Sequence, residues 1–177
     1  LVERAENGHV TRSASEALLA TPMPVLDGGV AEISGGACEL EYDAAANVHL
    51  AFTTGTHPSV YYGRWNGSVW TLEVVDAMGF NTGGLVTPTT VRLRVDGSNN
   101  PHVLYLRDSQ LWYATKSGAT WTRERVDSTA IPLYTTDSEF SFLALNAMGR
   151  PTVGYQTYSS NSRQVLSTRT GPGAWTQ

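Results

Sequence analysis

Apolar and polar residues alternate over three short segments of the chain, residues 39–42, 92–95 and 142–145, as in β-strands with one buried face. A turn such as Asp96-Gly-Ser-Asn-Asn-Pro101 follows, rich in residues that tolerate a positive φ or preset a bend. Each segment is therefore predicted to be a strand that ends in a tight turn. Only residues 13–20 have a pattern that resembles helical periodicity.

The three segments belong to a repeat that aligns without gaps over residues 39–52, 92–105 and 142–155. A second block follows each segment, at 60–71, 111–122 and 165–176, and ends in a Trp-Thr pair. The matched positions include Leu40/Leu93/Leu143, Asp43/Asp96/Asn146, Phe52/Tyr105/Tyr155 and Trp70/Trp121/Trp175. In this alignment Trp65 corresponds to Lys116 and Thr170, and Trp112 corresponds to Tyr61 and Leu166.

Each repeat unit is predicted to hold four short antiparallel strands, the second opened by a proline at 101 or 151, where a missing N–H is tolerated. Four strands that recur every 40 to 50 residues or so are typical of β-propeller blades. We therefore predict an all-β fold, a β-propeller of four-stranded antiparallel blades with about three blades in this chain. The predicted blades span residues 37–76, 89–127 and 139–177.

The two ends of the chain fit one outer strand. Set against Trp70-Thr-Leu-Glu-Val-Val-Asp76, the last residues Trp175-Thr-Gln177 and the first residues Leu1-Val-Glu3 match with a single residue missing between them. Residues 1–3 are thus predicted to complete the third blade, and residues 4–36 form a long insertion. Propellers typically have about four to eight blades, so three blades predict either half of a six-bladed ring or a piece of a larger propeller.

Composition narrows the class of protein. Charged residues make up 16% of the chain, against about a quarter in an average globular protein, while hydrophobic residues reach 41%. The net charge is −4 and no Lys/Arg run occurs, which argues against nucleic acid as a partner. Cys38 is the single cysteine, so no intrachain disulfide forms. No apolar run is long enough to span a membrane, and no signal peptide is recognisable. A mature exported protein has the same features.

Unit two resembles bacterial extracellular β-propeller repeats of the pattern Leu-x-x-Asp-x-x-Gly-x-Pro-His-Val-x-Tyr followed by a Trp-Thr strand. The matching residues are Leu93, Asp96, Pro101, His102, Val103, Tyr105 and Trp121. The turn at residues 116–121 is similar to the Asp-box (BNR) hairpin of sialidase-like propellers, although the Asp of that box is missing from all three units. The resemblance implies an extracellular or cell-surface bacterial protein and leaves its activity open, because propellers host many unrelated functions.

Charged residues interrupt the apolar pattern of the first strand in units one and two. These weak catalytic candidates are Glu39, Glu41, Arg92 and Arg94, and unit three has Phe142 and Ala144 instead. In a propeller the first strands line the central channel. An acid pair there suits glycoside hydrolysis, and an arginine pair suits a carboxylate ligand. Ion pairing between neighbouring blades is the structural alternative, and we favour it.

Aromatic residues that do not recur are the candidates for ligand binding. A pyranose ring stacks its apolar C–H face on an exposed aromatic ring, while its hydroxyls need a polar rim. The candidates are Trp65, Trp112, Tyr134 and Tyr158, although we favour ordinary packing for each. Linkers at 77–88 and 128–138 are the other places where ligand contacts are expected.

Recurring polar residues are predicted to be structural. Asp43, Asp96 and Asn146 are expected to cap the turn after the first strand, and His49 and His102 share one repeat position. No ligand set for a metal is recognisable, and a calcium loop needs more oxygen ligands than residues 96–100 supply. We expect no cofactor, with calcium as the minor alternative.

The sequence favours a non-catalytic binding or scaffold module of an exported bacterial protein, with a glycan or a protein as ligand and with self-association or further blades. The alternatives are a glycan hydrolase with Glu39 and Glu41 near the axis, and a purely structural assembly module.

Overall fold

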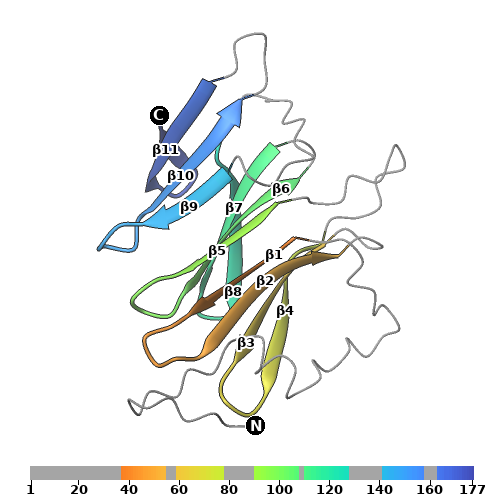
Figure 1. Cartoon of the computed structure of the whole chain (residues 1–177). Coiled ribbons are helices and arrows are strands. Elements are labelled where there is room, and N and C mark those ends of the chain that lie inside the picture. Colours follow the sequence, from red (N-terminus) through yellow and green to blue (C-terminus); the bar gives the residue numbers. More distant parts are fainter. Residues whose placement is uncertain (1–36, 55–58, 78–89, 108–109, 128–140, 158–162) are drawn as a thin grey trace, which may run out of the picture. The chain divides into compact units, whose positions relative to one another are not determined.

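The structure, a computed structural model, describes residues 37–54, 59–77, 90–107, 110–127, 141–157 and 163–177. These residues form twelve strands and no helix, which confirms the all-β prediction (Figure 1). The predicted strand at residues 1–3, the insertion at 4–36, Tyr134 and Tyr158 lie outside the described residues. The strands are β1 (Cys38–Tyr42), β2 (Val48–Thr54), β3 (Ser59–Trp65), β4 (Trp70–Ala77), β5 (Val91–Val95), β6 (Pro101–Arg107), β7 (Gln110–Ser117), β8 (Thr120–Arg125), β9 (Ser141–Leu145), β10 (Pro151–Thr157), β11 (Arg163–Gly171) and β12 (Ala174–Thr176).

Each repeat unit folds into one antiparallel four-stranded sheet whose strands pair in chain order. Sheet one holds β1–β4 (orange to yellow in Figure 1), sheet two β5–β8 (green) and sheet three β9–β12 (blue). The first strands of successive sheets contact one another, β1 with β5 and β5 with β9. The repeat predicts three such sheets joined through their first strands, and the structure has this arrangement. The described residues do not form a closed ring.

The turn between the first two strands is built the same way in every sheet. In sheet one the Asp43 side chain accepts hydrogen bonds from the backbone N–H groups of Ala45 and Asn47, at 2.9 Å each. The Ala46 N–H donates to the Asp43 carbonyl. Ala46, Asn99 and Gly149 occupy the same turn position with φ of 61°, 63° and 72°. We predicted from the sequence that Asp43, Asp96 and Asn146 cap this turn, and these hydrogen bonds are those of an Asx-capped turn.

Every sheet has two faces that differ in what they contact. Residues paired across antiparallel strands point to the same side of a sheet. The forward face carries the rows Glu39–Ala51–Tyr62–Glu73, Arg92–Leu104–Tyr113–Glu124 and Phe142–Gly154–Leu166. The rear face carries the rows Leu40–Leu50–Gly63–Leu72, Leu93–Val103–Ala114–Arg123 and Leu143–Val153–Ser167.

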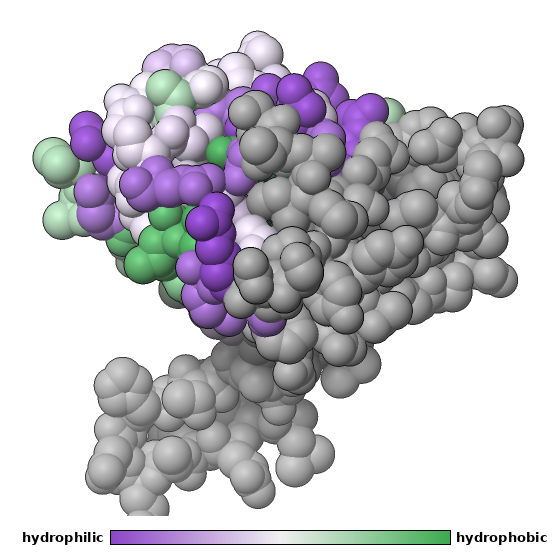
Figure 2. Space-filling model, turned by 90° about the horizontal axis from the view of Figure 1, so that it is seen from above, coloured by the Kyte–Doolittle hydropathy of each residue, from purple (hydrophilic) through white to green (hydrophobic). Residues whose placement is uncertain are grey.

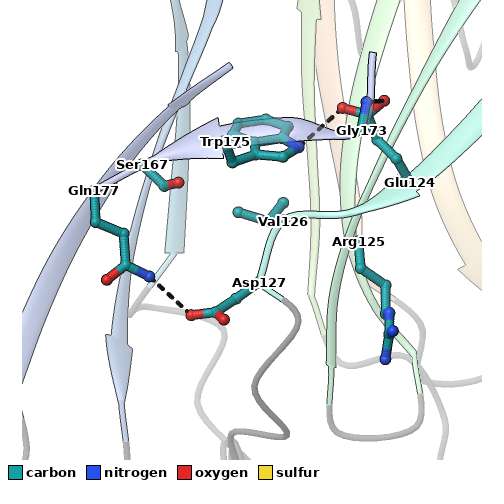
Figure 3. A pocket seen from close by; sticks show the side chains of 8 residues that line it. All are labelled: Glu124, Arg125, Val126, Asp127, Ser167, Gly173, Trp175 and Gln177. Atoms are coloured by element: carbon teal, nitrogen blue, oxygen red, sulfur yellow. Dashed lines mark hydrogen bonds between the residues drawn. The ribbon is translucent and has the colours of Figure 1, made fainter. Parts of the chain in front are cut away.

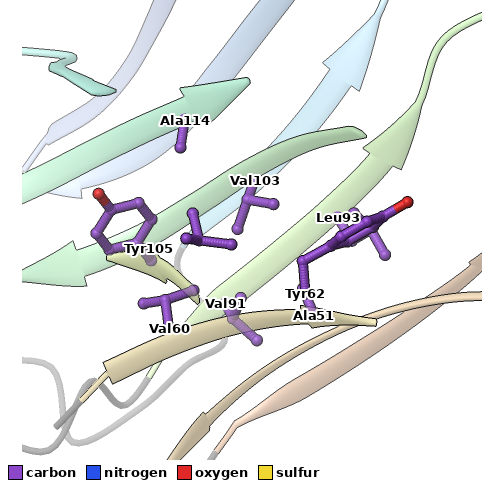
Figure 4. Close-up of a cluster of buried hydrophobic side chains, with 9 residues drawn as sticks. Ala51, Val60, Tyr62, Val91, Leu93, Val103, Tyr105 and Ala114 are labelled. Carbon is purple, nitrogen blue, oxygen red and sulfur yellow. The ribbon is translucent and has the colours of Figure 1, made fainter. Parts of the chain in front are cut away.

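The core lies between the sheets, with the forward face of one sheet packed on the rear face of the next. Ala51, Val60 and Tyr62 of sheet one form one buried cluster with residues of sheet two that include Leu93 and Val103 (Figure 4). Sheets two and three share a second cluster of the same kind. Its buried members are Leu104, Leu106, Leu111, Tyr113, Val126, Leu143, Val153, Tyr155 and Val165. Burial of these apolar side chains is the main force that holds successive sheets together.

The strand pairing corrects the gapless alignment in the second half of unit three. Arg169, and not Thr170, pairs with Trp175 as Lys116 pairs with Trp121. Val165, and not Leu166, pairs with Tyr155 as Trp112 pairs with Tyr105. The stretch from Arg169 to Trp175 has one residue more than its counterpart in unit two, and the register shifts between Arg169 and Gly171. An irregularity in the last turn therefore absorbs the extra residue.

The turn geometry generates a stability prediction at Ala46. An alanine in the left-handed region costs roughly 1–2 kcal/mol, which glycine does not incur. We expect Ala46→Gly to raise the free energy of unfolding by about 1 kcal/mol in a urea titration, because the favourable backbone conformation outweighs the added entropy of the unfolded chain. The reverse change at the matched position, Gly149→Ala, is the control and is expected to destabilise. A loss of stability in Ala46→Gly would contradict this account of the turn.

Candidate functional site

The charged residues of the first strands pair across neighbouring sheets. Arg94 Nη1 on β5 lies 2.8 Å from Glu39 Oε1 and 3.2 Å from Glu41 Oε2, both on β1. Glu39 Oε2 also accepts the backbone N–H of Leu93 at 2.6 Å. On the other side, Arg92 Nε donates to the carbonyl oxygen of Ser141 at the start of β9, at 2.8 Å. Ion pairs of Arg94 thus link β1 to β5, and a hydrogen bond from Arg92 to a backbone carbonyl links β5 to β9.

The environment of Glu41 is the one chemical feature of this group that resembles an acid catalyst. Burial raises the pKa of Glu41 above its ordinary value; the Arg94 guanidinium opposes this shift and the neighbouring Glu39 carboxylate adds to it. The side chains of Glu39, Glu41 and Arg94 are all partly exposed, at 24%, 28% and 34%. A solvated carboxyl pair bridged by one arginine is a common structural arrangement.

A hydrogen-bonded chain of Asp, His and Tyr lies on the forward face of sheets one and two. The His49 Nδ1 atom lies 2.6 Å from the Tyr62 hydroxyl and its Nε2 atom lies 3.3 Å from Asp43 Oδ2. A neutral imidazole protonated on Nε2 satisfies both contacts, since Tyr62 then donates to Nδ1. In sheet two the equivalent chain is Asp96, His102 and Tyr113.

The chain in sheet one has the groups of a catalytic relay without its access, whereas Asp96, His102 and Tyr113 of sheet two line a cavity. His49 is fully buried, so a substrate has no route to its ring. Burial lowers the pKa of His49 below its ordinary value; the neighbouring Asp43 opposes the shift and Arg64 adds to it. The same balance lowers the pKa of His102, with Asp96 and Arg169 in these roles. Both rings are therefore neutral near pH 7, and they connect the capped turn to the third strand of their own sheet.

Several polar contacts between sheets converge on one glutamate of β4 and one of β8, the last strands of sheets one and two. Glu124 on β8 accepts the indole N–H of Trp175 at 2.9 Å and the backbone N–H of Gly173 at 2.8 Å (Figure 3). It also accepts both the Nε and Nη2 groups of Arg169, at 2.7 and 3.1 Å. Burial opposes ionisation of Glu124, but the bonds from Arg169, Gly173 and Trp175 hold its pKa below the ordinary value.

The same contact joins sheets one and two. Glu73 on β4 accepts the Trp121 indole N–H at 3.0 Å and pairs with Lys116. The edges of the two tryptophan rings meet a tyrosine of the preceding sheet, Tyr62 for Trp121 and Tyr113 for Trp175, with ring centroids 5.4 Å apart in both pairs. We call this set of glutamate, cation, tryptophan and tyrosine the clasp.

An aspartate three residues beyond each glutamate extends the clasp. Asp76 accepts the hydroxyl of Tyr105 at 2.9 Å and the guanidinium groups of Arg107 and Arg123. Asp127 accepts the hydroxyl of Tyr155 at 2.8 Å and the side-chain amide of Gln177 at 2.9 Å. The sequence analysis assigned no role to these four carboxylates, although their signal was present in the recurring motifs Glu73-Val-Val-Asp76 and Glu124-Arg-Val-Asp127.

A cavity of about 440 Å³ lies beside the second clasp. Its wall includes Glu124, Asp127, Ser167, Trp175 and Gln177, and Figure 3 shows these side chains around it. The Ser167 hydroxyl is buried and has no hydrogen-bond partner within the described residues. An indole ring, a carboxylate, an amide and a free hydroxyl together suit a small polyhydroxylated ligand better than an apolar one.

A second cavity of about 360 Å³ opens near the capped turn of sheet two. Its wall carries more basic groups, among them Lys116, Arg150 and Arg169. Lys116 is already paired with Glu73, and Arg169 with Glu124. The charges of Lys116 and Arg169 are therefore balanced by the glutamates of the clasps.

The aromatic candidates lie apart from both cavities. Trp112 packs against the cluster between sheets one and two, with the Arg107 guanidinium 5.4 Å from its ring centroid. Trp65 is half-buried, and its ring lies 5.7 Å from that of Trp70. The structure does not gather Trp65 and Trp112 into one site, and their ligand-binding role stays a prediction.

No protein-family model matches the chain, and no curated protein matches it. The described residues contain no group of three His, Cys, Asp or Glu side chains that is placed to hold a metal ion. Within the same residues, no helix has the length and apolar character to cross a membrane.

The clasp predicts a measurable loss of stability on neutralising Glu124. Hydrogen bonds to a charged group contribute about 1.5–3 kcal/mol, so Glu124→Gln is expected to lower the free energy of unfolding by about that amount in a urea titration. Arg125→Gln on the same strand is the control, because its side chain forms a single hydrogen bond, to Gln110, among the described residues. Equal free energies of unfolding for the two variants would show that the clasp does not stabilise the fold.

The buried imidazoles predict a stability that depends on pH. A lowered folded pKa means that the contribution of His49 and His102 is complete above the ordinary pKa of about 6.5 and is lost as the pH falls below it. We expect the free energy of unfolding to fall between pH 7 and pH 5, and to fall less steeply in the variant His49→Asn/His102→Asn. Equal slopes for the two proteins, measured by urea titration at each pH, would show that these rings are not the cause.

Proposed function

We propose that this chain is a three-blade part of a β-propeller and acts as a non-catalytic binding and scaffold module of an exported bacterial protein. The observation that carries the proposal is that the charged and imidazole side chains form contacts within the fold. The carboxylates, cations and imidazoles of the repeat form ion pairs and hydrogen bonds that join sheets or hold the capped turns. Arg94 holds Glu39 and Glu41, and the clasps hold Glu73 and Glu124.

The blade arrangement has support from three features that recur. Each sheet is a four-stranded meander, successive sheets contact through their first strands, and the forward face of one covers the rear face of the next. Propellers are built of such sheets arranged around a central axis. The low charge of the chain and its resemblance to extracellular propeller repeats support an exported protein.

A glycan is the ligand that we favour, and the 440 Å³ cavity is its proposed site. Sugar hydroxyls need donors and acceptors around the rim, which Asp127, Gln177 and Ser167 supply, beside the apolar ring of Trp175. A protein ligand is the alternative, and it has no comparable feature in the described residues.

The competing function is glycan hydrolysis at Glu39 and Glu41. The raised pKa of Glu41 beside a second carboxyl is the observation that favours it. Release of fluorophore from fluorogenic glycosides by the parent chain, abolished in Glu41→Gln, would establish the hydrolase and overturn the binding module.

Removal of one hydroxyl tests the proposed glycan site. The parent chain is screened against neutral and acidic disaccharides by saturation-transfer NMR, and affinities are then measured by titration. Ser167→Ala should weaken binding about two- to tenfold, the value of one hydrogen bond, while the fold persists, because Ala114 occupies the same position in sheet two.

The matched control is Ser141→Ala. Its hydroxyl is also buried without a partner but is not part of this cavity wall. Binding that is unchanged in Ser167→Ala, or absent for every saccharide in the parent chain, would remove the cavity as a glycan site.

A further inference from the structure

The aspartate that caps the first turn has different neighbours in sheet one and in sheet two. In sheet one Arg64 Nη2 lies 3.3 Å from Asp43 Oδ2, and Arg64 pairs with His49 across β2 and β3. The residue that pairs with His102 in sheet two is Thr115, whose side chain is shorter. Sheet two therefore repeats the Asp–His pair of sheet one, and among its described contacts no guanidinium group lies against the aspartate.

The change from arginine to threonine coincides with an opening in the structure. The side chains of Asp43 and His49 are 0% exposed, whereas those of Asp96 and His102 are 17% and 7% exposed. The 360 Å³ cavity is lined by Asp96, His102 and Thr115 from sheet two, and by residues of β11 and of the turn before β10 from sheet three. The repeat thus encloses the Asp–His pair in sheet one and leaves the pair of sheet two accessible from a cavity.

Asp96 keeps its negative charge in this cavity. Burial opposes ionisation of Asp96, but hydrogen bonds from Asn100, Ser98 and His102 hold its pKa below the ordinary value. The Asp96 Oδ2 atom accepts from the side-chain amide of Asn100 at 3.0 Å and lies 3.5 Å from His102 Nε2. Burial also lowers the pKa of His102, so these donors are neutral near pH 7. A carboxylate held by neutral donors favours a cationic partner.

Three cations in the cavity wall oppose a cationic ligand. Lys116 and Arg169 are paired with the glutamates of the clasps. The Lys116 pair belongs to the interface of sheets one and two, which also contains the guanidinium group of Arg64, so a clasp cation does not exclude a second one. Arg150 is exposed, and its side chain forms no hydrogen bond or ion pair among the described residues. Water and salt screen an exposed charge of this kind.

The cavity also has apolar surface that suits an aliphatic chain. Met148 lines it and is 79% exposed. Its counterpart in the turn of sheet two is Ser98, since the backbone N–H groups of both donate to the turn-capping side chain two residues earlier. A long thioether side chain covers methylene groups that a serine does not reach. Figure 2 shows hydrophobic patches bordered by hydrophilic residues on the face in view, a surface that suits a short apolar stem with a charged end.

We propose that the 360 Å³ cavity binds a small molecule that carries a guanidinium group on an aliphatic stem, with Asp96 as its anionic partner. The guanidinium group lies against Asp96 as that of Arg64 lies against Asp43, and the stem packs on Met148. A planar guanidinium matches the geometry of a carboxylate. This site goes beyond the proposed glycan cavity, because the two cavity walls have no residue in common.

Histidine NMR tests the proposal with n-propylguanidinium, which reproduces the arginine side chain from Cβ outward. Its addition should shift the ring signal of His102, assigned by its loss in His102→Asn. The signal of His49 should stay in place, because Arg64 already lies beside Asp43. Thr115→Arg supplies the guanidinium group from the chain itself and should weaken binding by about tenfold or more, the value of a hydrogen bond to a charged group.

The matched control is Thr176→Arg, which adds the same charge at an exposed strand residue outside the cavity wall and should leave the affinity unchanged. The reverse change opens a site in sheet one. Arg64→Thr removes the guanidinium group beside Asp43, so n-propylguanidinium should then shift the His49 signal and raise the urea midpoint of this variant more than that of the parent chain.

A His102 signal that does not move at tens of millimolar n-propylguanidinium, or that moves equally in the parent chain and in Thr115→Arg, would overturn the proposal. Binding of inorganic phosphate in its place, lost in Arg150→Gln, would identify an anion site and overturn it as well. Neither result bears on the proposed function, since the effect of Ser167→Ala on saccharide binding is measured at the other cavity.

Discussion

The interaction on which the rest of the fold depends is a partly buried glutamate shared between two sheets. Glu124 is 14% exposed and is surrounded by an indole N–H, a guanidinium and a backbone N–H, all from the following sheet. A buried carboxylate without such partners would be strongly destabilising. The charge therefore fixes the position of the next sheet, because a displaced sheet would leave it unpaired. Apolar packing supplies the attraction between sheets, and the glutamate supplies their register.

The close packing of sheets also encloses the Asp–His–Tyr chain of sheet one. An Asp–His–Tyr chain such as Asp43–His49–Tyr62 has the order of groups that proton transfer uses, yet its imidazole is fully buried. The repetition of this chain in sheet two indicates a structural part of the repeat, since a reaction centre has no need of a second copy in the next sheet. Two cavities remain open to a ligand, one beside the clasp, where the Ser167 hydroxyl has no partner among the described residues, and one lined by His102.

The sequence predicted the strands and turns well because their determinants are local. Alternation of apolar residues, Asp96 at a turn and Pro101 at a strand start act over a few positions. The clasp was missed because Glu73 and Trp121 lie 48 residues apart, and only the packing of two sheets brings them together. The misaligned half of unit three has a similar origin, since one extra residue before Trp175 shifts every counterpart unless the strand pairing is known.

The polar contacts between sheets and the exposed apolar side chains differ in what their burial costs. A clasp formed within one chain assembles as the chain folds, so its charges are paired when they lose water. Between separate chains the same charges would lose their hydration upon association, and that cost offsets much of their attraction. Leu166 and Phe142 have no such cost, and their burial is favourable in proportion to the area removed from water.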